Sequence, residues 1–80
     1  SDEPKKKTNT YMGEKQLAEV EEEIARLEAT MKMYEVQLSN PVVQQDLEEM
    51  ANISKQLSDT ESSLQVLYEK WEHFSELLVE

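Results

Sequence analysis

A heptad repeat constrains the fold of this chain more than any other feature of its sequence. From Leu17 onwards, apolar residues recur at alternating steps of three and four, and a second series begins at Ile53. Apolar side chains at this spacing form one stripe along a helix, which is the seam of a left-handed coiled coil. The first series is Leu17, Val20, Ile24, Leu27, Met31, Tyr34 and Leu38, and the second is Ile53, Leu57, Thr60, Leu64, Leu67, Trp71, Phe74 and Leu78.

A proline separates the two series. Pro41 cannot lie in a helix interior, because it lacks an N–H group and its ring clashes with the preceding turn, so the first helix should end near Leu38. Asn40 directly before Pro41 is a helix-start signal. Asp46, followed three residues later by Glu49, is a second one and resembles a capping box. The second helix therefore begins at either Pro41 or Asp46.

The predicted fold is all-α, a two-helix antiparallel coiled-coil hairpin, because a short connection makes neighbouring helices antiparallel. We expect the first helix over about 14–38, the turn over 39–45 and the second helix over about 46–79. Folding the chain at residues 39–41 pairs positions whose numbers sum to about 81. In that register Tyr11 and Met12 lie over Tyr68 and Trp71, Trp71 is buried, and the N-terminal segment folds back on the open end.

Charge is distributed unevenly along the chain. Residues 1–10 are polar and without periodicity, and we expect them to be a basic linker or tail ahead of one helical domain over 11–80. The formal net charge is −10, and residues 16–80 hold fifteen acidic but only four basic residues, so this body should repel nucleic acid and anionic membranes. The candidate nucleic-acid-binding residues are the other four basic residues, Lys5, Lys6, Lys7 and Lys15. A flexible basic linker is the alternative interpretation of the lysines.

The composition argues against catalysis. With no Cys, one Gly and one His, the chain cannot assemble a thiolate zinc site, a phosphate-binding glycine loop or a catalytic triad. We therefore expect no enzyme activity, no cofactor, no metal and no small-molecule ligand, and an exposed His73. No apolar run is long enough to span a bilayer and no secretory signal is visible, which favours a cytoplasmic location. Tyr68, Trp71 and Phe74 could stack on bases, but their helical spacing favours core packing.

Three segments together resemble a known family. They are "YMGEKQLAEVEEEIARLE", "LSNP" and "LYEKWEHFSEL", and over about residues 8–79 they are similar to the C-terminal domain of ABC-F ATP-binding cassette proteins, closest to the Uup type. The positions that match the family pattern are Tyr11, Leu17, Ile24, Leu27, Leu38, Pro41, Leu64, Tyr68, Lys70, Trp71, Glu72 and Leu77.

The resemblance implies a function that the periodicity alone does not. The parent protein would be a soluble cytoplasmic ATPase that has ATP as its cofactor and acts on the ribosome in translation. This chain would be its non-catalytic accessory arm, contacting ribosomal RNA or DNA backbone through the lysines. The alternatives are a protein-interaction or dimerisation coiled coil without nucleic-acid contact, and a spacer. We expect the isolated domain to be a monomer.

Overall fold

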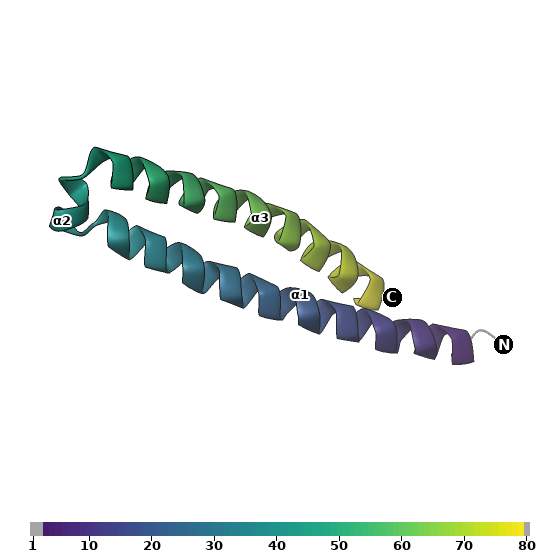
Figure 1. The fold of residues 1–80 in the computed structure, drawn as a ribbon. Coiled ribbons are helices and arrows are strands. Elements are labelled where there is room, and N and C mark those ends of the chain that lie inside the picture. The colour runs from purple at the N-terminus through teal and green to yellow at the C-terminus, as the bar shows by residue number, and fades with distance from the viewer. Residues whose placement is uncertain (1–2, 80) are drawn as a thin grey trace.

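Two long helices form an antiparallel hairpin. The computed structural model describes the backbone of residues 3–79 and the side chains of residues 12–78. Helix α1 spans Glu3–Leu38, the single-turn helix α2 spans Pro41–Gln44, and helix α3 spans Leu47–Val79. Figure 1 shows α1 and α3 side by side with α2 in the connection between them. The predicted all-α fold is confirmed.

The hairpin is a rod. Its principal extents are 66 × 14 × 14 Å and its radius of gyration is 18.4 Å. A compact chain of this length would have a radius of gyration of about 12 Å. Within the described residues, no helix contains a stretch apolar enough to cross a lipid bilayer.

Both start signals in the connection begin a helix. Asn40 caps α2, because its side-chain oxygen accepts a 2.9 Å hydrogen bond from the backbone N–H of Val42, and Pro41 occupies the first turn. Asp46 caps α3, because its carboxylate accepts a 3.1 Å hydrogen bond from the backbone N–H of Glu49. The sequence left two possible starts for one helix, and each of them begins a helix of its own, first the short α2 and then the long α3.

Side chains of the connection cap the C-terminal end of α1 by donating hydrogen bonds to its last carbonyls. The Gln44 side-chain amide donates a 2.9 Å hydrogen bond to the carbonyl of Leu38, and the Ser39 hydroxyl donates a 2.7 Å bond to the carbonyl of Val36. The last carbonyls of a helix have no partner within it, so these bonds replace water at the α1 terminus. They hold residues 39–46 in a defined conformation that fixes the helix register.

The predicted register is wrong. The Tyr34 hydroxyl donates a 2.7 Å hydrogen bond to the Gln56 side-chain oxygen, and a Cβ added to Gly13 would lie 3.0 Å from Leu78 Cδ2. With two further contacts between α1 and α3, the numbers of facing residues sum to between 90 and 96 rather than about 81. The reason is α2, because it lengthens the connection to residues 39–46 and packs against α3. Helix α1 therefore pairs with residues further along α3 than a turn at residues 39–41 would allow.

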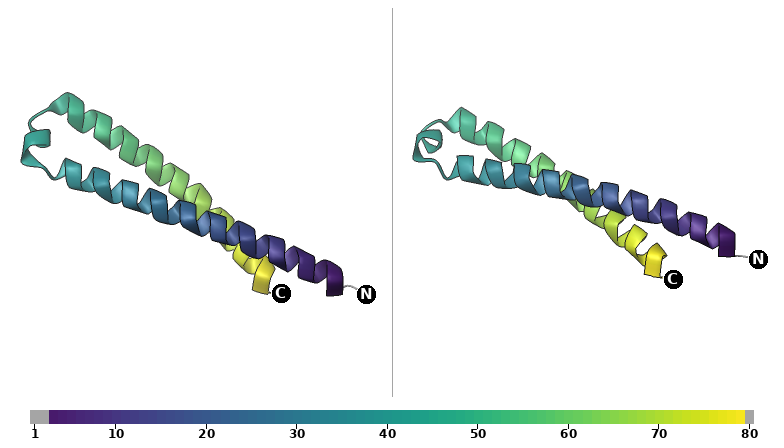
Figure 2. Two further views of the ribbon diagram at one scale, coloured as in Figure 1. Left: turned by 60° about the horizontal axis from the view of Figure 1, so that its bottom comes forward. Right: turned by 90° about the horizontal axis from the view of Figure 1, so that it is seen from below.

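The N-terminal segment does not fold back. Helix α1 runs without a break from Glu3, so residues 3–10 are its first turns where the sequence predicted a tail. Pro4 is compatible with this because proline is tolerated in the first turn of a helix. Since Gly13 faces Leu78, the turns before Gly13 extend past the end of α3, as both views of Figure 2 show.

The core is a narrow seam along the heptad positions. Among the described residues only Val20, Ile53 and Leu64 are buried, with exposed fractions of 9%, 4% and 3%. The other heptad residues are half-buried, except Trp71, which is 39% exposed. The prediction that Trp71 is a buried anchor is therefore wrong. In a pair of helices each helix is covered on one side only, so a side chain as large as indole reaches the edge of the seam.

Candidate functional site: the lysine end and the aromatic slot

The lysine end of the rod is the site that the sequence predicts. Lys5, Lys6 and Lys7 belong to the first turns of α1, and their side chains lie outside the described residues. Lys15 is described and exposed, at the level where the last turns of α3 begin to cover α1. The helix therefore places the backbone of all four lysines at the open end, opposite the α2 connection.

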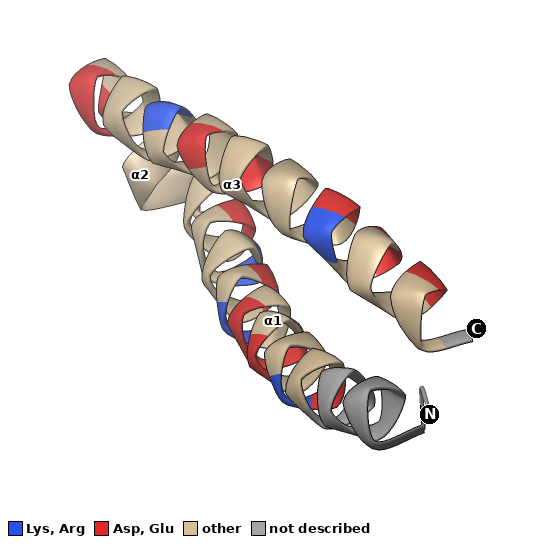
Figure 3. Cartoon of the chain, turned by 90° about the vertical axis from the view of Figure 1, so that its right-hand side faces the viewer, with Lys and Arg blue, Asp and Glu red and all other residues tan. Residues whose placement is uncertain are grey.

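Acidic residues outnumber basic residues on the rest of the rod. Figure 3 shows Asp and Glu on both long helices and few basic residues between them. Two ion pairs occur among the described residues, Arg26 with Glu23 on α1 and Lys55 with Asp59 on α3. Each joins two exposed side chains of the same helix. Surface pairs of this kind contribute little to stability. Most carboxylates of residues 12–78 thus have no basic partner, and the body of the rod keeps a negative surface.

An aromatic slot lies on one flank of the hairpin, and the sequence did not predict it. We use this name for the groove of about 340 Å³ lined by Glu21, Ile24, Ala25, Glu28, Tyr68 and Trp71. Its two aromatic side chains are each 39% exposed. The Trp71 indole N–H donates a 2.9 Å hydrogen bond to Glu21 Oε2, and the Tyr68 hydroxyl donates a 2.6 Å bond to Glu28 Oε2. Each of these two rings therefore holds one carboxylate of α1 at its edge.

The pKa of Tyr68 reports on this arrangement. It is raised above the ordinary value of 10.0, first by the hydrogen bond that the hydroxyl donates to Glu28, then by loss of solvation and by the negative charge of the carboxylate. The hydroxyl consequently stays protonated through the physiological range and remains a donor to Glu28.

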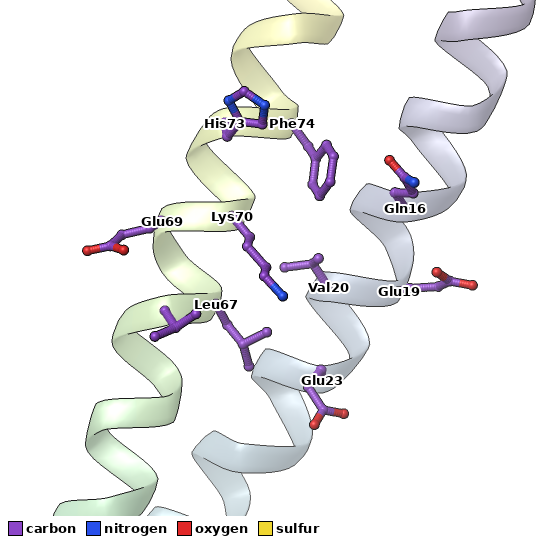
Figure 4. A pocket seen from close by; sticks show the side chains of 10 residues that line it. Gln16, Glu19, Val20, Glu23, Leu67, Glu69, Lys70, His73 and Phe74 are labelled. Carbon is purple, nitrogen blue, oxygen red and sulfur yellow. The ribbon is translucent and has the colours of Figure 1, made fainter.

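A second groove lies on the opposite flank of the seam. Val20, Leu67 and Phe74 form its apolar part, and Figure 4 shows Lys70 reaching across it toward Val20 while Glu19 points away. His73 is exposed, as predicted, and its ring lies 5.7 Å from that of Phe74 at an interplanar angle of 57°. Within the described residues, no three His, Asp or Glu side chains are placed to hold a metal ion.

Residue spacing alone could not have found the aromatic slot. Trp71 occupies a heptad position, which predicts burial, and Tyr68 lies next to one. The informative signal is chemical, because an indole and a phenol each need a hydrogen-bond partner and so favour the edge of a helix pair. Glu21 and Glu28, seven residues apart on α1, are those partners.

Comparison with known proteins identifies the family. Residues 8–76 match the family model described as the ABC transporter C-terminal domain, which is most of the chain. The chain belongs to this family. As an ABC transporter C-terminal domain, the hairpin is an accessory part of an ABC-type protein. No curated protein and no solved structure has significant similarity to the chain.

Proposed function

We propose that this ABC transporter C-terminal domain is the accessory arm of a cytoplasmic ABC-F ATPase of the Uup type. In this proposal the lysine end of the arm contacts the phosphate backbone of ribosomal RNA or DNA. ATP is the cofactor of the parent protein, and the arm itself catalyses no reaction. The family match supports the accessory role, and the resemblance of the Tyr11, Pro41 and Trp71 segments supports the subtype.

One structural observation supports the lysine end as the contact. Helix α1 extends past the end of α3, and Lys5, Lys6 and Lys7 belong to the extending turns. At a rise of about 1.5 Å per residue, their backbone lies about 9–12 Å beyond Gly13 along the helix axis. This is comparable to the Debye length of about 8 Å at physiological ionic strength, so salt screens much of the repulsion from the acidic residues of α3.

The contact would position the arm without reading sequence. Lysine side chains neutralise phosphates, whereas sequence is read by groups that reach base edges. An arm with three or four phosphate contacts and an acidic body would bind weakly alone, and tethering to the parent protein would raise its effective concentration at the target.

The experiment compares two triple variants of equal charge. In the first, Lys5, Lys6 and Lys7 are changed to Gln; in the control, Lys32, Lys55 and Lys70 on the body of the rod are changed to Gln. Fluorescence anisotropy with labelled duplex DNA and a structured RNA measures affinity over a salt series. We expect the first variant to lose binding and the control to keep most of it. For duplex DNA the wild-type slope of log affinity against log salt should be about −3 to −4.

Three results would count against the proposal. Equal losses in both triple variants would mean that only total charge matters. Unchanged binding after the three N-terminal substitutions would rule out the lysine end. Absence of binding by the wild type at low salt would favour the alternative, a protein-interaction coiled coil, which the exposed rings of Tyr68 and Trp71 support.

A further inference from the structure

The aromatic slot has no part in the proposed nucleic-acid contact. The slot lies between the middle of α1 and the C-terminal part of α3. The candidate nucleic-acid-binding lysines all lie nearer the start of α1, three of them in its first turns and the fourth at position 15. The lining of the slot combines two apolar side chains, Ile24 and Ala25, with two aromatic rings and two carboxylates.

The two carboxylates of the slot are held in place but not neutralised. Each accepts one hydrogen bond through Oε2, from Trp71 or from Tyr68, which leaves its other oxygen available as an acceptor. Neither Glu21 nor Glu28 forms an ion pair with a basic side chain of residues 12–78. Each end of the slot thus presents an exposed aromatic face beside an unneutralised carboxylate.

This combination matches the chemistry of a guanidinium group. A cation is attracted to the face of an indole or phenol ring, and the planar guanidinium stacks there while its N–H groups donate to a carboxylate. The aliphatic part of an arginine side chain can cover apolar side chains such as Ile24 and Ala25. Phosphates and nucleotides fit poorly, because both carboxylates repel them.

The spacing of the carboxylates defines the shape of the partner. Glu21 and Glu28 are seven residues apart on α1, which corresponds to about 10.5 Å along its axis. Two residues seven positions apart on another helix have the same separation and lie on nearly the same face, since seven residues make about two turns. A helix lying along the slot could therefore place one basic side chain at each end.

We propose that the aromatic slot binds a helix of a partner protein that carries two arginines seven residues apart. One guanidinium stacks on the ring of Trp71 and donates to the free oxygen of Glu21, and the other stacks on the ring of Tyr68 and donates to the free oxygen of Glu28. The proposal adds a protein-binding flank to the hairpin and does not depend on the nucleic-acid contact at the lysine end.

The test uses the 80-residue chain and a synthetic peptide. The probe is a capped alanine- and glutamine-rich peptide with two arginines seven residues apart; the control peptide has neutral, nearly isosteric citrulline at both positions. Trp71 is the only tryptophan, so its indole N–H gives a single resonance from the slot itself. We expect a saturable shift of that resonance with the arginine peptide and almost none with the citrulline peptide. A peptide with its arginines five residues apart should bind more weakly.

A matched pair of variants separates local pairing from general attraction to an acidic surface. Glu21→Gln removes one slot carboxylate, and Glu22→Gln removes the same charge from an exposed neighbour that does not line the slot. We expect Glu21→Gln to weaken peptide binding about tenfold or more, as the loss of a charge-assisted hydrogen bond implies. Glu22→Gln should weaken it less than about twofold, as expected for a screened surface charge. Circular dichroism checks that both variants keep the helical content of the wild type.

Each contrary outcome overturns the inference. Equal weakening by Glu21→Gln and Glu22→Gln would mean that only net charge attracts the peptide. An unshifted indole resonance, or equal binding of the citrulline peptide, would show that the slot does not recognise the cation. Substituting Lys5, Lys6 and Lys7 by Gln should leave peptide binding unchanged, so the outcomes for the slot and the lysine end can be told apart.

Discussion

Leu64→Ala should be one of the most destabilising substitutions of an apolar side chain in this hairpin. Leu64 is 3% exposed and is one of three buried side chains among the described residues. Leu-to-Ala changes in protein cores cost about 2–5 kcal/mol. We expect the lower part of that range, about 2–3 kcal/mol, because two helices without a third layer can move together and close part of the cavity. A core in a chain of this size supplies only about 3–5 kcal/mol of stability, so this loss would be about half of it.

Val66→Ala is the matched control for this prediction. Val66 lies two residues further along α3 and is 51% exposed, so it loses little buried surface when truncated, and alanine is the better helix former. We expect its effect to stay below about 1 kcal/mol.

Urea unfolding followed by circular dichroism measures both free energies of unfolding, and thermal unfolding gives a second estimate. For a domain of this size, a loss of 2–3 kcal/mol lowers Tm by about 8–24 °C. If the two variants lose equal stability, or if Leu64→Ala costs less than Val66→Ala, the packing of α1 on α3 described above is refuted.

Four further predictions concern the register, the connection, Tyr68 and the oligomeric state. A double-mutant cycle of Tyr34→Phe and Gln56→Ala should give a coupling energy of about 0.5–1.5 kcal/mol, and a coupling near zero would contradict the observed register. Asp46→Ala should cost about 1 kcal/mol in urea unfolding by removing the α3 cap, whereas Asp46→Asn should cost much less. Spectrophotometric titration should find that the pKa of Tyr68 lies above 10.0 and that Glu28→Gln lowers it. Because the pKa is raised in the folded state, the contribution of the Tyr68–Glu28 hydrogen bond to stability is complete at neutral pH and is lost as the pH rises through and above the ordinary value. Sedimentation at two concentrations should find a monomer, and dimerisation that depends on concentration would contradict this.

The heptad pattern was a reliable guide to the seam of α1. All seven of its predicted positions, from Leu17 to Leu38, are buried or half-buried, because a periodic apolar stripe has only one side on which to pack. The end of α1 at Leu38 also follows from the sequence, since the proline three residues later cannot continue the helix.

The pairing of the helices could not be predicted in the same way. Register depends on the length of the connection, and the connection depends on whether Asn40 and Asp46 cap one helix or two. Asn40 and Asp46 each cap a helix of their own, so α2 forms between them. As a result, the numbers of facing residues sum to about ten more than the sequence predicted. The expected placement of residues 11 and 12 beside Tyr68 and Trp71 was derived from the shorter turn and was wrong for this reason.

The two candidate sites differ in how well they can be predicted from the sequence. The charge distribution alone points to the lysine end, and the role of Lys5, Lys6, Lys7 and Lys15 in binding stays a prediction. The aromatic slot needs the three-dimensional register, because Glu21 and Trp71 are fifty residues apart and meet only when α1 and α3 pair as they do.

The seam of this rod is one layer deep, so each turn of a helix depends on the few turns directly across from it. Its buried residues are spread along the length, with Ile53 near the connection, Val20 near the open end and Leu64 between them. Such a structure behaves almost as a one-dimensional array in which neighbouring segments stabilise one another, and opening begins where such contacts are fewest. Local unfolding of the hairpin should therefore begin at its free ends and proceed turn by turn toward α2. In native-state hydrogen exchange, the lysine end would open and close many times while the half of the rod next to α2 stays folded.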